Sequence, residues 1–254
     1  MDELYSDEQK LVRDSVRQFV NQEIIPNIEE WYEKNHFPLE IVKKMGETGI
    51  FGPNVSSDYG GGGLDNISYG LIMQELERGD SSIRVMCSIQ TSLVMNNIYE
   101  HGNEFHKDEF LIKLSKGELI GSFGLSEPAH GSDPSSMQTR HKIDREHYII
   151  NGSKMWIGGA GHANWFYVLA RTGNDQSHKS LSGFIVEADS AGLEVGKKEE
   201  KMGQRSSDTR SVTFENVMVP KENLIGEAEG NGWLQAMVSF DRSRPMLASH
   251  ALGN

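Results

Sequence analysis

The chain has 254 residues, of which 37% are hydrophobic and 24% charged, and its formal net charge is −12. This composition is typical of a soluble globular protein with room for about two domains. The acidic balance argues against nucleic-acid binding, which requires clustered cations, and no run approaches the roughly 18 apolar residues that insert into a membrane.

The compartment is indicated by the cysteine content and by the N-terminus. The single cysteine, Cys87, excludes a disulfide framework within the chain and fits a reducing compartment. The start, residues 1–4, is acidic, whereas secretory and organellar presequences are basic. We therefore expect a cytoplasmic protein, or a mitochondrial matrix protein numbered after processing.

The first part of the chain carries helical periodicity. Ser6 with Gln9 three residues later has the form of a capping box, and apolar residues then recur at helical spacing. A second helix is predicted over 39–47, with Pro38 at its first turn and Gly49 just past its end. Further helices are predicted over 67–77, 82–101 and 105–115.

The helix predicted over 82–101 is apolar around much of its circumference, so we expect it to be central and buried. Arg84 lies near its start. Its guanidinium either pairs with Glu75, Glu77 or Asp80, or it points into a ligand cavity and binds an anion. The local sequence leaves both possibilities open.

The helical pattern gives way to a loop over 123–134. This loop contains two prolines, two glycines and almost no periodic apolar pattern, as expected of a shaped loop at a junction. By composition it is either an ordinary linker or part of a ligand cleft between domains, where ligand sites are common.

Alternating periodicity after residue 120 predicts a compact β-domain, barrel-like or a sandwich. We expect two strand segments within 148–157, joined in a hairpin at Asn151-Gly152. Further strands are predicted over 165–170, 183–187, 212–214 and 217–219. A helix follows residue 232, and no later segment covers its apolar face. We therefore expect that the chain is truncated, or that another chain covers this helix.

Local chemistry alone points to no catalytic class. The nine histidines lack the paired spacing of a zinc site, and no nucleophile-elbow glycine pattern is present. The residues by themselves predict a ligand cleft where a helical domain meets a β-domain. A β-domain interaction module with a helical arm is the alternative.

Four segments in order resemble the flavin-dependent acyl-CoA dehydrogenases. They are the loop 123–134 with Gly131-Ser132-Asp133, then 151–157, 201–209 and 219–224. The resemblance runs from about residue 6 to the last residue. It implies an α+β fold with an N-terminal all-helical domain (1–118), a small β-barrel-like or sandwich domain (119–226), and the first helix (227–254) of an absent C-terminal four-helix bundle.

The resemblance also implies FAD lying along the β-domain. The positions that match flavin contacts of the family are Phe123, Leu125, Ser126, Gly131, Trp156, Ile157 and Gly158. A flat redox-active ring requires an apolar wall and hydrogen-bond donors at its edge. Gly158 departs from the pattern, because the family usually has a threonine or serine there, whose hydroxyl hydrogen-bonds near the reactive flavin nitrogen. We expect its absence to alter the flavin potential or hydride transfer, unless a water takes its place.

A second set of positions matches acyl-CoA contacts of the family. These are Arg84, Ser88, Ser132, Asp241 and Arg244. Arg84 and the segment 88–95 resemble glutaryl-CoA dehydrogenases, in which an arginine binds the distal carboxylate of the substrate, although Val85 replaces a serine found there. The segments 163–165, 184–189 and 240–245 resemble medium-chain acyl-CoA dehydrogenases instead. An unpaired buried guanidinium would favour a substrate carboxylate; both acyl types stay open.

The family oxidises acyl-CoA to 2-enoyl-CoA in the degradation of fatty acids, amino acids or dicarboxylates. A glutamate takes the α-proton while the β-hydrogen leaves as hydride, and hydrogen bonds to the thioester oxygen make the α-carbon acidic. The resemblance further implies an electron-transfer flavoprotein as electron acceptor and a homotetramer.

The family's catalytic glutamate belongs to the C-terminal bundle, and none of the glutamates present, Glu127 included, matches it. We therefore expect the base beyond Asn254 and expect this chain alone to be inactive. Two alternatives are an acyl-CoA oxidase of the same fold, in which oxygen reoxidises the flavin, and a non-catalytic flavin- or acyl-CoA-binding subunit that needs a partner chain.

Overall fold

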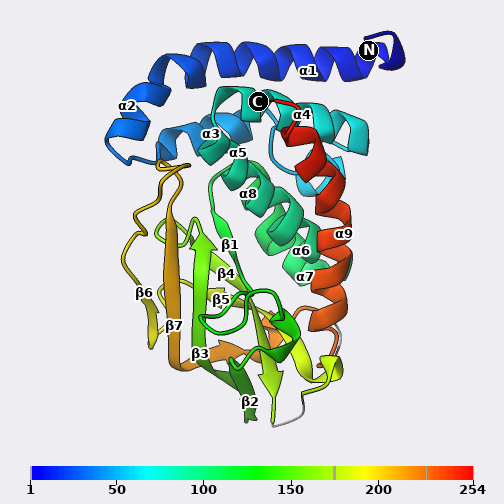
Figure 1. Cartoon of the computed structure of the whole chain (residues 1–254). Coiled ribbons are helices and arrows are strands. Elements are labelled where there is room, and N and C mark those ends of the chain that lie inside the picture. Colours follow the sequence, from blue (N-terminus) through cyan, green and yellow to red (C-terminus); the bar gives the residue numbers. More distant parts are fainter. Residues whose placement is uncertain (1, 174–175, 227, 254) are drawn as a thin grey trace.

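The computed structural model describes residues 2–173, 176–226 and 228–253. A group of helices covers one end of a curled sheet, and the last helix runs from the sheet back along these helices (Figure 1). The predicted α+β class, with a helical part followed by a β part, is confirmed. The division at residues 118/119 and 226/227 stays a prediction, and residues 227 and 254 lie outside the described residues.

The N-terminal helices begin as the sequence predicts. In front of α1 (Asp7–Phe19), the Ser6 hydroxyl accepts a hydrogen bond from the Gln9 N–H, and the Gln9 side chain accepts one from the Ser6 N–H. This capping box is confirmed. The π-helical turn η2 (Val20–Ile24), the 3₁₀ turn η3 (Ile25–Asn27) and α2 (Ile28–Glu33) follow.

The central helices surround the predicted buried helix. Helix α3 (Leu39–Glu47) has the predicted bounds and precedes α4 (Asn66–Gly79). The helix predicted over 82–101 consists of α5 (Ser81–Ser88), η5 (Ile89–Met95) and α6 (Asn96–His101). Its middle segment, η5, is π-helical, which the periodicity did not indicate. Such segments occur often at functional sites.

Gln90, in the π-helical segment, connects the helices to the sheet. Its amide nitrogen donates to the Leu114 and Leu119 carbonyls at 2.9 and 3.0 Å, and its amide oxygen accepts the Gly121 N–H at 3.0 Å. Because the side chain is fully buried, these bonds fix the point where the helical part ends. The remaining helical elements are η1 (Asp2–Leu4), η4 (Ser57–Tyr59), α7 (Glu104–His106), η6 (Lys107–Leu111) and α8 (Ile112–Ser115).

In the described ranges, seven strands form one mixed sheet in the order β1-β4-β2-β3-β7-β6, with β5 also paired to β4. The strands are β1 (Gly121–Gly124), β2 (Arg140–Asp144), β3 (His147–Gly158), β4 (Trp165–Thr172), β5 (Leu181–Glu187), β6 (Leu193–Val195) and β7 (Thr209–Pro220). Strand β4 pairs in parallel with β1 and β2, and the other pairs are antiparallel. Short 3₁₀ turns are η7 (Pro134–Ser136), η8 (His178–Ser180) and η9 (Lys221–Asn223).

The hairpin predicted at Asn151-Gly152 is wrong. Both residues lie inside the single strand β3, where the register with β7 shifts between Ile150 and Gly152. A Cβ on Gly152 would lie 2.5 Å from the Thr139 hydroxyl oxygen, so this glycine permits a bulge under a close neighbour. The turn that does join β2 to β3 contains Arg145, at φ 53°.

The last helix, α9 (Gly232–His250), does find cover within the chain. It packs on α4, on η5 and on β5, and it buries Ala236, Ser239 and Met246. The expectation that nothing in the chain covers it is therefore wrong for this face. Leu234 and Leu247 of the same helix remain exposed.

His141 is a buried titratable residue in the core of the sheet, so it should make the stability of the fold depend on pH. The ring is buried against Tyr148 and Phe184, and neither of its nitrogens has a hydrogen-bond partner among the described residues. Burial lowers the pKa of His141, although the Glu229 carboxylate opposes the shift. Because the unfolded chain then binds the proton more readily, stability is full above the ordinary histidine pKa of about 6.5 and falls as the pH drops below it.

We expect the His141→Phe variant to lose part of this acid sensitivity. Urea unfolding between pH 7.5 and pH 5, in steps, measures it: the parent should lose stability across that range and the variant should lose less. Equal slopes for both proteins would contradict the assignment.

Candidate functional site

The loop after β1 lies against the last residues of β3. The Met155 N–H donates to the Ser126 carbonyl at 2.8 Å, and the Lys154 ammonium donates to the Leu125 carbonyl at 3.1 Å. These bonds bring the predicted residues of the loop beside Trp156. Two segments about thirty residues apart in the sequence thus form one site.

Trp156 has an unusual conformation. Its backbone adopts φ 62°, in the left-handed region that disfavours residues with a side chain, and its side chain is 60% exposed. Ile157 beside it is buried. A strained backbone that holds a large ring toward solvent costs free energy, and such strain clusters at binding and catalytic sites.

Phe123 connects the site to the last helix. Its ring stacks on Tyr167, with centroids 5.2 Å apart, and meets the edge of Phe240 of α9 at 6.0 Å. The Tyr167 hydroxyl in turn donates to the Gln235 side chain at 2.6 Å. Leu125 is buried next to this group. The aromatic stack therefore gives the loop a rigid apolar base.

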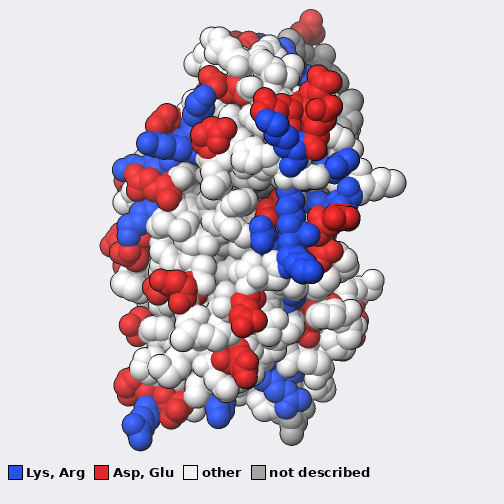
Figure 2. All heavy atoms as spheres, turned by 90° about the vertical axis from the view of Figure 1, so that its left-hand side faces the viewer, with Lys and Arg blue, Asp and Glu red and all other residues white. Residues whose placement is uncertain are grey.

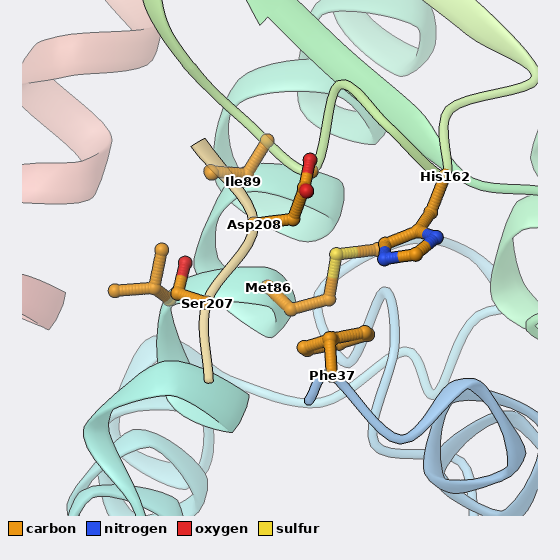
Figure 3. Close-up of a pocket in the computed structure, with 8 residues that line it drawn as sticks. Phe37, Met86, Ile89, His162, Ser207 and Asp208 are labelled. Carbon is orange, nitrogen blue, oxygen red and sulfur yellow. The ribbon is translucent and has the colours of Figure 1, made fainter. Parts of the chain in front are cut away.

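The turn after β3 is held by Asp208. Its carbonyl accepts the Gly159 N–H and its carboxylate accepts the Gly161 N–H, both at 2.7 Å. Figure 3 shows Asp208 beside Met86 and Ile89, around a cavity of about 10 Å³. A cavity of this size has room for about one water, so it marks the packing of the central helix on the turn.

Gly158 lies in this contact. A Cβ at position 158 would lie 2.5 Å from the Ile89 Cδ1. Because Cδ1 is the end of a flexible side chain, we expect Gly158→Ser to cost only about 1 kcal/mol of unfolding free energy. The Ile89→Val exchange removes that methyl group and should recover most of the loss in the double variant. Thermal unfolding of the three variants measures this, and additive losses would show that the two positions do not interact.

Gly131 and Ser132 are exposed farther along the loop. Among the described residues, neither donates to or accepts from Trp156–Gly158. The neighbouring Asp133 carboxylate accepts bonds from the Ser135 and Ser136 hydroxyls, which shape this end of the loop. The structure thus brings together only part of the predicted flavin set.

The premise that Arg84 is unpaired is wrong. Its Nε donates to the Glu77 carboxylate at 2.6 Å, and both side chains are buried. Burial raises the pKa of Glu77, but hydrogen bonds from Ser81 and Arg84 outweigh it, so the net shift is downward. The pair is possible because Asp80 ends α4 and caps α5, which turns the two helices toward each other. Ser88, one turn further, is also buried.

Asp241 and Arg244 lie on α9 near Phe240. Both are exposed, and they form an ion pair with each other across one helical turn. Phe240, next to Asp241 in the same helix, contacts Phe123 at the start of the loop.

Lys154 and Glu127 are functional candidates that the sequence did not assign. Lys154 is 0% exposed, and its ammonium lies 3.0 Å from the Glu127 carboxylate. Burial lowers the pKa of Lys154 to about 8, against the raising effect of Glu127. Burial also raises the pKa of Glu127, but Lys154 and backbone N–H donors outweigh it and lower the pKa. Strand alternation from Tyr148 and Ile150 was the available signal, since it places residue 154 on the buried face.

A larger hollow of about 520 Å³ lies elsewhere, between residue 35 and the segment 198–205. Lysines, an arginine and two glutamates line it: Lys198, Lys201, Arg205, Glu199 and Glu200. The Lys198 and Lys201 ammonium groups donate to backbone carbonyls there. Acidic and basic side chains intermingle on the face that carries β6 and β7 (Figure 2).

None of the helices in the described ranges is both long and apolar enough to cross a membrane. Within the same ranges, no group of three or more histidine, cysteine, aspartate or glutamate residues is placed to hold a metal ion.

Comparison with known proteins identifies the family. Residues 6–118 match the model of the acyl-CoA dehydrogenase N-terminal domain, and residues 122–217 match the model of the acyl-CoA dehydrogenase middle domain. The short-chain specific acyl-CoA dehydrogenase of Clostridium acetobutylicum is 42% identical over 246 residues, covering 97% of this chain and 65% of that protein. The chain therefore spans less than two thirds of the length of this relative.

The solved structures that are similar over 100% of the chain include two with 36% identity. One is a glutaryl-CoA dehydrogenase from Mycobacterium smegmatis in complex with FADH2, with 36% identity, a TM-score of 0.93 and 64% of that chain covered. The other is a chain in the structure of the electron transferring flavoprotein of Acidaminococcus fermentans, with 36% identity, a TM-score of 0.95 and 66% covered. This chain belongs to the acyl-CoA dehydrogenase family.

Proposed function

We propose that this chain binds FAD where the loop after β1 meets Trp156, and that it serves the α,β-dehydrogenation of an acyl-CoA thioester to the 2-enoyl-CoA. The observation that carries the proposal is the exposed Trp156, held in a strained conformation beside the loop. FAD, when bound, would supply the hydride acceptor. A strained backbone and an exposed ring are expected of a residue whose side chain finds its contacts only when the ligand binds.

The residues present fit such a cofactor. The Trp156 ring offers a flat apolar wall, and Phe123 and Leu125 provide a rigid base. Within the described part of the chain, the Ser126 N–H and hydroxyl have no hydrogen-bond partner, so both can donate to a ring edge. We assign Phe123, Leu125, Ser126 and Trp156 to the flavin, together with Gly131, Ile157 and Gly158.

We propose that Ser132, Asp241, Arg244, Arg84 and Ser88 contact the acyl-CoA. The relatives include a short-chain specific enzyme and a glutaryl-CoA dehydrogenase, which favours a short acyl chain. Glu77 already neutralises Arg84, so a distal substrate carboxylate would share this guanidinium with Glu77. An uncharged short chain requires no such sharing.

We further propose that the proton-abstracting base is not one of the residues of this chain. Glu127 is engaged by Lys154 and by two backbone N–H groups, so it is not free to take a proton from a substrate. An electron-transfer flavoprotein is the proposed acceptor, in agreement with the similarity to a chain of such a structure. A homotetramer stays a prediction. Buried Cys87, a free thiol, suits the reducing cytoplasm or mitochondrial matrix.

The cofactor proposal is tested by titrating the purified chain with FAD and following the quenching of flavin fluorescence. We expect saturable binding with one FAD per chain, weakened at least about tenfold in Trp156→Ala, since aromatic stacking is worth about 1–3 kcal/mol. Met218→Ala is the control, because Met218 of β7 is 59% exposed yet lies outside the site. Equal weakening by both changes, or no binding by the parent, would refute the proposal.

The substrate proposal is tested on the FAD-loaded chain with butyryl-CoA and glutaryl-CoA in parallel. We expect both to perturb the flavin spectrum, with tighter binding of butyryl-CoA, and no bleaching of the flavin at native enzyme rates. Tighter binding of glutaryl-CoA that Arg84→Met abolishes would reverse the substrate assignment. Bleaching at native rates would show that the base does lie in this chain.

A further inference from the structure

Lys154 and Glu127 form a deeply buried ion pair next to the site, and the proposed flavin contacts do not include either residue. The Lys154 ammonium lies 3.1 Å from the Leu125 carbonyl, 3.0 Å from the Glu127 carboxylate and 3.5 Å from the Met137 sulfur. Two charges removed from water are costly unless each is paired and hydrogen-bonded, and a buried pair often adds little net stability. A role other than stability would explain its presence.

Glu127 anchors the far end of the loop. Its carboxylate accepts the Gln138 N–H at 2.6 Å and the Thr139 N–H at 2.8 Å. Arg171, which is also fully buried, donates to the Met137 carbonyl at 2.7 Å, and its own N–H donates to the Thr139 carbonyl at 2.9 Å. The segment that leaves the site after residue 127 is therefore tied back at residues 137–139, where it enters β2.

Lys154 controls the orientation of one peptide group. The Leu125 carbonyl points inward to the Lys154 ammonium. In a trans peptide the carbonyl and the following N–H point in opposite directions. The N–H of Ser126 must then point away from Lys154, and it has no acceptor among the residues that the structure describes. The next carbonyl, of Ser126, is fixed by the Met155 N–H.

We propose that Lys154, held by Glu127, is a positioning residue that fixes the Ser126 N–H as a donor for the flavin ring. The inference rests on the proposed FAD site and goes beyond it, because it assigns the preorganisation of that site to a pair that does not touch the cofactor. A donor fixed in advance requires no reordering of the loop when the ligand binds.

The test compares the double variant Lys154→Met/Glu127→Gln with the parent chain. The double change removes both charges together, so that neither is left buried without its partner. The matched control is Lys142→Met, the same exchange at an exposed lysine of β2. Two quantities are measured: the FAD dissociation constant by flavin fluorescence, and hydrogen–deuterium exchange of residues 123–130 without FAD.

We expect the double variant to bind FAD at least about tenfold more weakly, the loss equivalent to one hydrogen bond to a fixed donor. Residues 123–130 should exchange faster in it, while residues 166–170 of β4 keep the protection of the parent. The control should match the parent in both measurements. A double variant with parental affinity and parental exchange would overturn the proposal.

Two further outcomes are also decisive. If the double variant loses its far-ultraviolet circular dichroism, it is unfolded, and the single variant Glu127→Gln is measured in its place. Parental FAD affinity together with parental exchange in the folded Glu127→Gln variant would overturn the proposal. If the parent does not bind FAD, the proposed cofactor fails instead. The exchange measurement on the cofactor-free chains then still decides whether the pair orders the loop.

Discussion

Replacing Arg84 by methionine is expected to lower the free energy of unfolding by about 3–5 kcal/mol, the usual cost of removing one partner of a buried ion pair. The loss arises because Glu77 stays behind as a buried carboxylate whose main cationic partner is gone. Urea unfolding followed by circular dichroism measures it. The double variant Arg84→Met/Glu77→Leu removes both charges and should recover much of the loss.

The control for this prediction is Lys34→Met. Lys34 and Glu30 also form an ion pair, but their side chains are 67% and 62% exposed, so solvent already screens the charges. Removal of this exposed pair should lower the free energy of unfolding by less than about 1 kcal/mol. If Arg84→Met cost no more than this control, the Arg84–Glu77 pair would not be the buried contact described above, and Arg84 would again be available for a substrate carboxylate.

Truncating Phe110 to alanine is the second change with a large expected effect, about 3–5 kcal/mol of unfolding free energy. Phe110 belongs to η6 of the helical part, and its ring meets Trp165 of β4 edge to face, with centroids 4.4 Å apart. The truncation leaves a cavity where the helices meet the sheet. Thermal unfolding of the whole molecule should therefore occur at a lower temperature than in the parent.

The matched control is Phe105→Ala, since Phe105 is the same residue type, on the same run of helices, and is 49% exposed. Its truncation should cost well under half as much as that of Phe110, because less apolar area leaves the interior. Equal losses in the two variants would show that the contact between Phe110 and Trp165 does not join the helical part to the sheet.

Local sequence determined those features whose signals are contained within a few residues. The hydrogen bonds of the Ser6 capping box and of the helix over 39–47 join residues that are close in the sequence. Their local patterns therefore predicted them correctly. The change from helical to alternating periodicity near residue 120 agrees with the passage from α8, which ends at Ser115, to β1, which begins at Gly121. Four ordered motifs were sufficient to predict the family, which the comparisons confirm.

Tertiary structure decided the features that depend on a distant partner. Asn151-Gly152 has the composition of a hairpin turn, yet the glycine lies in a bulge of β3, because Thr139, just before β2, lies against it. The guanidinium of Arg84 pairs with the carboxylate of Glu77, which is one of the three acidic residues that the local sequence left open as partners. Lys154 and Glu127 are 27 residues apart, and only the packing of the loop on β3 makes them a pair. Local patterns specify backbone conformation, whereas the environment of a buried charge is set by whichever residues the fold brings to it.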